Sequence, residues 1–180
     1  FLKGLDNVGE ILCDINLRIS KKGLIQIKSE RIGIELLKSS KTKNFRNKNN
    51  WWESSDFGEI QKFNNTLYLK FMGRKDNAFN SGGEIVFPEV IKSRLRDFIL
   101  NKEILINNFM ISKRPNKEWG NRFIIILYFK KDTKKIDVEY SLKLLKNFSK
   151  EWPKHERPEN WIICKKQAND IKKSNYKFEK

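Results

Sequence analysis

The spacing of apolar residues predicts two amphipathic helices in the second half of the chain. The first follows Pro88, since a proline is accepted in the first turn of a helix. The second runs from Asp137 to Trp152 and is stopped by Pro153. Apolar residues recur three and four positions apart in both segments. They are Val90, Ile91, Leu95, Phe98 and Ile99 in the first segment and Val138, Leu142, Leu145, Phe148 and Trp152 in the second.

Short β-prone runs predict a hairpin and a further strand in the first half of the chain. INLRI, residues 15–19, and LIQI, residues 24–27, are separated by the turn-forming residues SKKG, which is typical of a hairpin. In FNNTLYLKF, Leu67 and Leu69 alternate with Tyr and Lys as they would in a strand. Residues 38–50 have almost no apolar content, and we expect an exposed loop there.

The second half contains three further predicted strands. EILINNFMI and FIIILYF flank the turn-like KRPNKEWG, so we expect two neighbouring antiparallel strands, the second at the centre of a sheet. WIIC, residues 161–164, adds the third. The order after Gly73 is therefore hairpin, helix, strand, strand, helix, strand. This order predicts a small α+β domain in which two helices cover a three-stranded sheet.

The charge of the chain indicates an affinity for phosphates without choosing their source. Lys and Arg outnumber Asp and Glu by 38 to 22 over 180 residues, a net charge of +16. Such a field attracts nucleotides, coenzyme A and nucleic acid alike. Because the Lys residues are spread through every segment together with many Asn and Ile, the excess also fits a compositional bias.

Cysteine usage and hydropathy predict a cytoplasmic protein. Cys13 and Cys164 are far apart and His155 is the single histidine, so neither a metal site nor a disulfide framework has support. The longest apolar run, Phe123–Phe129, is much shorter than the roughly 20 residues that span a bilayer. The first residues lack the pattern of a signal peptide. We expect no membrane partner.

The most informative string is GRKDNAFNSGGEIVFPEVI, which begins at Gly73. Gly82 and Gly83 permit a left-handed or crowded backbone, and the Arg74 guanidinium can donate in a fork to ribose or phosphate oxygens. Taken alone, the string also fits a glycine-rich hairpin turn. Lys75 and Asp76 stand between a predicted strand and a loop, where a hinge can absorb a large change of backbone angles.

This string resembles the hinge motif of the adenylate-forming superfamily, which includes acyl-CoA synthetases, luciferases and nonribosomal adenylation domains. The motif reads GRxDxxI and is followed by a glycine loop; Phe79 stands at the isoleucine position. The form of this string, with NSGGE followed by FPE, resembles the same segment in acid–CoA ligases of the o-succinylbenzoate type. Those ligases serve menaquinone and phylloquinone biosynthesis. The resemblance implies that Asp76 is the hinge residue and that Ser81, Gly82 and Gly83 enter the site for thioester formation.

Upstream, WWESSDFG resembles the W-x-x-T-G-D-x-G segment of the superfamily, with Ser54 and Ser55 in place of Thr and Gly. The resemblance makes Asp56 the ribose-binding acid, whose two oxygens match a vicinal diol. By its own context, Asp56 also fits a turn or cap residue. Downstream, Trp119 and Gly120 resemble the superfamily's W-G-E segment, with Asn121 in place of the acid.

The superfamily carries a catalytic lysine in its C-terminal tail, and the resemblance places it at Lys177. YKFEK matches a G-K-W-E-R pattern, with Tyr176 in place of Gly and Lys180 in place of Arg. A small shift of register makes Lys172 or Lys173 the alternative, and the tail also fits a solvated lysine-rich segment. An ammonium at that position would stabilise the charge that develops during adenylation.

The resemblance also predicts a domain organisation. Residues 1–72 correspond to the last β-rich subdomain of the large adenylation domain, 73–76 to the hinge and 77–180 to the small C-terminal domain. The chain has no Gly/Ser/Thr-rich phosphate loop ending in Lys and no Y-G-x-T-E segment. Binding of ATP and Mg²⁺ would therefore require the large domain, in cis or in trans. The other expected partners are an acid substrate and coenzyme A. We expect the chain alone to be inactive.

Two other functions compete with a ligase fragment. A basic nucleic-acid-binding module is suggested by the net charge together with Phe45, Trp51, Trp52 and Phe63 as stacking groups. The chain has no recognised nucleic-acid-binding signature, and we rank this function below the ligase. The other is a non-catalytic interaction domain that kept the ligase fold after losing catalysis, since a fold does not determine its function.

Overall fold

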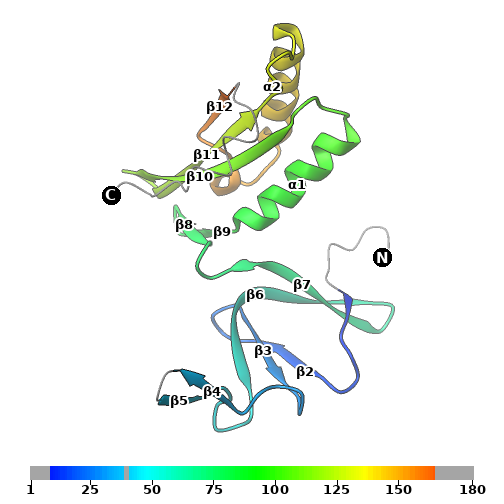
Figure 1. The fold of residues 1–180 in the computed structure, drawn as a ribbon, viewed down its shortest axis with the longest axis vertical. Coiled ribbons are helices and arrows are strands. Elements are labelled where there is room, and N and C mark those ends of the chain that lie inside the picture. Colours follow the sequence, from blue (N-terminus) through cyan, green and yellow to red (C-terminus); the bar gives the residue numbers. More distant parts are fainter. Residues whose placement is uncertain (1–8, 39–40, 165–180) are drawn as a thin grey trace. The chain divides into compact units, whose positions relative to one another are not determined.

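The computed structural model describes residues 9–38 and 41–164 and divides the chain into two compact units, Phe1–Ala78 and Phe79–Lys180. Figure 1 shows the first unit built from strands alone and the second from strands and helices. This arrangement confirms the expected α+β class. Among the described residues, no helix is both long enough and apolar enough to cross a membrane.

The first unit contains one antiparallel sheet and a separate hairpin. Its strands are β1 (Gly9–Glu10), β2 (Asn16–Ile19), β3 (Leu24–Lys28), β4 (Glu35–Lys38), β5 (Lys41–Asn44), β6 (Trp52–Phe63) and β7 (Thr66–Arg74). The five-stranded sheet has the order β1-β7-β6-β3-β2, and β4 and β5 form a separate two-stranded sheet. The predicted hairpin around SKKG is confirmed, since β2 pairs with β3 from Asn16 opposite Lys28 to Ile19 opposite Ile25.

The prediction of an exposed loop over residues 38–50 is wrong for its first part. Lys38 pairs with Lys41 in an antiparallel β4–β5 hairpin that continues to Asn44. Backbone hydrogen bonds alone build such a ladder, so a hairpin does not need the apolar alternation on which the prediction relied. The turn that follows is closed by the Asn47 side chain, whose Oδ1 accepts from the backbone N–H of Trp51.

Two asparagines form the turn of the β6–β7 hairpin, and a glycine allows β6 to pack closely against β3. Asn64 and Asn65 have φ angles of 45° and 63°, as the two central residues of a tight hairpin turn require. Gly58 lies against the side chain of Ile25 in β3, where a Cβ atom would come within 2.7 Å of Ile25 Cγ1. The glycine of the DFG segment is therefore needed for close packing between neighbouring strands.

The second unit has a mixed three-stranded sheet with two helices. Its elements are β8 (Phe79–Ser81), β9 (Glu84–Val86), α1 (Pro88–Asn101), β10 (Asn108–Asn116), β11 (Gly120–Tyr128), α2 (Lys135–Lys150), the 3-10 helix η1 (Lys154–Glu156) and β12 (Asn160–Cys164). The sheet order is β10-β11-β12, antiparallel on one side of β11 and parallel on the other. Both helices and the central position of β11 confirm the predictions from the sequence.

Both helices pack on one face of the sheet. Phe123, Ile125 and Leu127 alternate along β11 and, with Phe129 just after the strand, form a single buried cluster with residues of α1 and α2. The two helices also touch, because the rings of Phe98 and Phe148 stack with their centroids 3.9 Å apart. Their buried apolar residues are Ile91 and Leu95 in α1 and Val138 and Leu145 in α2. This core lies wholly within the second unit.

Candidate functional site

Asp56 and Arg74 are brought together by the β6–β7 hairpin. They are paired across the two strands, and Asp56 Oδ1 lies 3.8 Å from Arg74 Nε. A register shift between Phe57 and Gly58 separates this pair from the regular ladder that follows. Asp56 lies inside β6, so its interpretation as a turn or cap residue is wrong.

The backbone of Asp56 is held by Ser54, a residue to which the sequence analysis assigned no role. The Ser54 hydroxyl is buried, accepts from the Asp56 N–H at 3.0 Å and lies 3.3 Å from the Asp56 carbonyl, to which it can donate. Ser54 stands at the threonine position of the resembled motif. A hydroxyl at that position is the signal that could have identified it, because Ser and Thr share this bonding capacity.

Asp76 is the second carboxylate near Arg74. Arg74 Nη2 lies 3.7 Å from Asp76 Oδ2, so the guanidinium stands between two acids. Asp76 follows the end of β7 in a turn whose Asn77 and Ala78 N–H groups donate to the Arg74 carbonyl. The expected hinge residue therefore lies at an element boundary, two residues before the division between the units.

The geometry of this acid–guanidinium group allows it to bind a polar ligand. Both N–O separations exceed the 2.7–3.2 Å of a strong hydrogen bond, and the side chains of Asp56 and Arg74 are 38% and 56% exposed. Neither group is committed to a short internal bond by these two contacts. The carboxylate can therefore accept from a vicinal diol while the guanidinium donates to nearby ligand oxygens.

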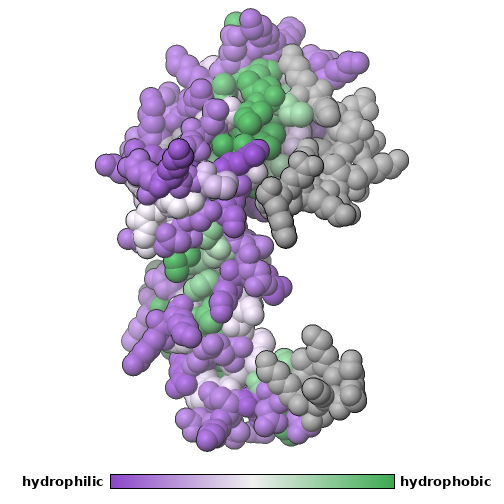
Figure 2. Space-filling view, turned by 90° about the vertical axis from the view of Figure 1, so that its left-hand side faces the viewer, coloured by the Kyte–Doolittle hydropathy of each residue, from purple (hydrophilic) through white to green (hydrophobic). Residues whose placement is uncertain are grey.

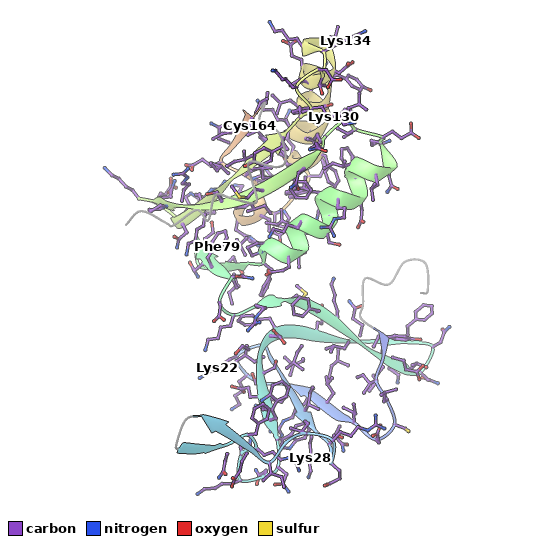
Figure 3. The ribbon with its side chains drawn as sticks, in the orientation of Figure 1. Lys22, Lys28, Phe79, Lys130, Lys134 and Cys164 are labelled. Atoms are coloured by element: carbon purple, nitrogen blue, oxygen red, sulfur yellow. The ribbon has the colours of Figure 1, made fainter. Side chains whose placement is uncertain are left out.

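The glycine pair forms the loop of the β8–β9 hairpin. Ser81 pairs with Glu84, and Gly82 and Gly83 have φ angles of 63° and 91°, as a two-residue turn requires. The Ser81 side chain is fully buried, and its Oγ has no hydrogen-bond partner within the described part of the chain. Phe79 begins β8, as Figure 3 shows, and packs edge to face on Phe123.

The predicted site residues that the structure describes fall into two groups, one in each unit. Asp56, Arg74 and Asp76 are together in the first unit, whereas the Ser81–Gly83 turn belongs to the second. Lys177, with its alternatives Lys172 and Lys173, lies outside the described residues. Within the two described ranges, no group of three or more His, Cys, Asp or Glu side chains could hold a metal ion.

Three of the aromatic residues proposed as nucleic-acid stacking groups are engaged within the protein. Phe45 and Trp52 stack on each other with their centroids 5.4 Å apart. The Arg18 guanidinium lies 4.0 Å from the centroid of the Trp51 ring. Phe63 is 42% exposed. A base would have to compete with these internal contacts for a stacking surface.

The two units together have the fold of part of an AMP-forming acid–CoA ligase. No protein-family model and no curated protein sequence matches the chain. Solved structures do match, and they cover 90–93% of this chain in the three cases described below. Because the sequence identities are only 18–20%, these matches show a shared fold and nothing more specific. The resemblance seen in the sequence is thereby confirmed at the level of the fold.

Two of these structures are o-succinylbenzoate–CoA synthetases. The Escherichia coli protein MenE, with a bound phenylether-linked analogue of OSB-AMS, matches with a TM-score of 0.61 at 20% identity over 93% of this chain. MenE from Bacillus subtilis, in complex with the acyl-adenylate OSB-AMP, gives 0.63 at 18% over 91%. Coronafacic acid ligase from Pectobacterium brasiliense gives 0.61 at 20% over 90%. The chain spans about a third of their lengths, namely 35%, 33% and 31%.

Proposed function

We propose that this chain is the C-terminal portion of an acid–CoA ligase, which activates a carboxylate as an acyl-adenylate with ATP and transfers it to coenzyme A. The observation that carries the proposal is the Asp56–Arg74 pair, set in the WESSDFG strand and the GRKD segment of a ligase-like fold. The NSGGE and FPE segments support an o-succinylbenzoate-like substrate and a role in quinone biosynthesis. In the proposed organisation, residues 1–72 end the large domain, 73–76 form the hinge and 77–180 form the small domain.

The residues of the first unit would bind the nucleoside part of AMP. Asp56 accepts hydrogen bonds from both ribose hydroxyls, and its backbone is held in place by Ser54. Arg74 donates to ribose or phosphate oxygens through its planar fork. Because Arg74 also lies 3.7 Å from Asp76, a nucleotide that draws the guanidinium toward itself would loosen a contact to the hinge residue.

The second unit would supply the groups that change between the two half-reactions. In the adenylation step, Lys177 would place an ammonium near the carboxylate, the α-phosphate and the leaving pyrophosphate, where negative charge develops. In the thioester step, rotation about Asp76 would replace this lysine by the Ser81–Gly83 turn. A hinge requires a few residues that can absorb a large change of backbone angles, and Asp76 lies in the turn after β7.

A large-domain portion, in cis or in trans, completes the proposed enzyme. Leu67 and Phe71 lie on the same face of β7 and are 46% and 37% exposed. Leu12, Ile34 and Phe63 of the same unit are also exposed, and Figure 2 shows hydrophobic side chains within a largely hydrophilic surface. An apolar strand face of this kind is typical of a surface that another protein segment covers. The acyl pocket and the ATP and Mg²⁺ sites would come from that portion.

Equilibrium binding of labelled AMP to the purified chain tests the proposed site. We expect Asp56→Ala and Arg74→Ala each to weaken AMP binding at least tenfold. Asp14→Ala and Arg31→Ala are matched controls, because they remove another acid–guanidinium pair of the same unit, 2.7 Å apart. Equal losses in all four variants would reject the assignment of the site.

A short single-stranded oligonucleotide, titrated over a range of salt concentrations, separates the ligase from the nucleic-acid-binding alternative. The ligase predicts weak oligonucleotide binding throughout this range. Tight binding that weakens steeply as salt rises and is indifferent to Asp56→Ala and Arg74→Ala would favour the basic module instead. Addition of the large-domain portion with ATP, a candidate acid and coenzyme A should release pyrophosphate; its absence would favour a non-catalytic interaction domain.

A further inference from the structure

Trp119 lies directly against the Ser81–Gly83 turn, which we call the glycine turn. The tryptophan stands in the turn between β10 and β11 and is half-buried. The Gly82 N–H donates to its carbonyl at 3.0 Å. A Cβ atom added at Gly82 would come within 2.5 Å of the Trp119 ring. The ring therefore occupies the space that any side chain at position 82 would need.

A second hydrogen bond joins the same two hairpins, and another closes the glycine turn on itself. Asn121 Nδ2 lies 3.3 Å from the Asn80 carbonyl and donates to it, while Asn80 Oδ1 accepts from the Gly83 N–H at 3.1 Å. Asn121 stands where the ligase motif carries an acid. An ionised carboxylate could not donate this hydrogen bond, so the contact depends on the residue that distinguishes this chain from the motif.

The Trp119 ring is itself held from the β11 side. The Arg122 guanidinium lies 4.7 Å from the ring centroid. Arg122 is in turn anchored, because it donates to the carbonyls of Lys154 and Arg157 at 3.0 and 2.9 Å. The Trp119 N–H donates to Asn116 Oδ1 at 3.0 Å, which fixes the backbone of its turn. All these contacts lie within the second unit.

We propose that Trp119 is a positioning residue that holds the glycine turn in the conformation required for thioester formation, with Asn121 as its auxiliary. This inference rests on the proposed function. In that step the thiol sulfur of coenzyme A bonds to the acyl carbon, the bond from that carbon to the phosphate oxygen breaks, AMP leaves and the thiol proton passes to solvent. If the turn is already fixed before the thiol arrives, the entropy cost of ordering it is not added to the barrier of the thioester step. Trp119 acts through the turn and does not touch the reacting atoms.

Amide hydrogen exchange in the ¹⁵N-labelled chain tests the contact without any turnover. We expect Trp119→Ala to speed exchange at Gly82 and Gly83 at least tenfold relative to the core amides of β11, and Trp119→Phe to restore part of the protection. Asn121→Asp should give a smaller increase at Gly83. Trp161→Ala is the control, since it removes a tryptophan packed on the core cluster at a different strand. Unchanged exchange at Gly82 in Trp119→Ala would overturn the inference.

The two half-reactions, measured after addition of the large-domain portion, test the role in catalysis. Trp119→Ala should slow thioester formation from preformed acyl-adenylate at least tenfold and leave pyrophosphate release within about twofold of the unaltered chain. Trp119→Phe should recover most of the thioester rate. Equal losses in both half-reactions, or none, would overturn the role. If the unaltered chain supports neither half-reaction, the proposed function fails and with it this role, while hydrogen exchange still decides whether Trp119 holds the turn.

Discussion

Asp56 of β6 and Arg74 of β7 face each other across the hairpin, 3.8 Å apart, although 17 residues separate them in the sequence. The pairing follows from the tight Asn64–Asn65 turn and from the register shift between Phe57 and Gly58. Because both side chains are more than a third exposed, the pair contributes about 0.2–1 kcal/mol to stability at most. The role that we propose for the pair is therefore ligand binding and not stabilisation of the fold.

Arg74→Lys should weaken AMP binding about tenfold, although the charge is kept. A single ammonium replaces the planar fork that can donate to two oxygens at once. Isothermal titration with AMP measures the change, and urea unfolding should show nearly unchanged stability. Arg31→Lys is the matched control in the same unit. An unchanged AMP affinity in Arg74→Lys would show that the guanidinium geometry is not used.

Arg94→Ala should destabilise the second unit by about 2 kcal/mol. Arg94 Nη1 donates to Glu156 Oε2 at 2.7 Å in a pair that is mostly buried, and its guanidinium lies 5.1 Å from the Trp152 ring centroid. Removal of the arginine deprives the Glu156 carboxylate, which is only 14% exposed, of this partner. Glu139→Ala breaks the exposed pair with Lys135 and should change the unfolding free energy by less than about 0.5 kcal/mol.

Gly58→Ala should destabilise the first unit by about 1–3 kcal/mol, because the new methyl group would overlap Ile25. A smaller side chain at position 25 should relieve the overlap, so Ile25→Ala should cost less in the Gly58→Ala background than in the original chain. Gly33→Ala is the control, since nothing lies within 4 Å of its Cβ position. Additive effects of the two substitutions at 58 and 25, in thermal or urea unfolding, would contradict the packing argument.

Ser81→Ala should leave the second unit equally stable or stabilise it by up to about 1 kcal/mol. The Ser81 hydroxyl is fully buried and, among the described residues, has no hydrogen-bond partner, so its removal ends a desolvation cost. Ser141 is a control that is also buried and whose Oγ donates to the Asp137 carbonyl at 2.7 Å. Ser141→Ala should cost about 1 kcal/mol. A larger loss for Ser81→Ala than for Ser141→Ala would indicate a partner of Ser81 Oγ.

Leu67→Ser combined with Phe71→Ser should weaken association with a separately produced large-domain portion at least tenfold, while leaving the chain folded. Both side chains are partly exposed on one face of β7, so the change should cost the isolated chain little. Ile136→Ser alters a residue of the second unit that is 71% exposed and serves as the control. Equal affinity for all variants in sedimentation or titration would place the contact elsewhere.

The sequence determined most of the elements, because helical periodicity and turn propensity are local properties. Pro88 and the apolar spacing after it predicted α1 over the residues where it occurs. α2 begins two residues earlier than expected, at Lys135, and ends at Lys150. Trp152 lies beyond its end yet is buried, since a side chain can fill the core from a turn as well as from a helix. Motif order also indicated Asp56 and Arg74 before any contact between them was known.

Only the tertiary structure decided which of these residues meet. The polar β4–β5 hairpin carries no apolar alternation, and its pairing depends on backbone hydrogen bonds. Ser54 beneath Asp56 and Trp119 against Gly82 are contacts set by strand register and by the packing of two separate turns. Periodicity along a chain specifies which face of an element is apolar. The distances between side chains of different elements are determined by close packing, which no local pattern encodes.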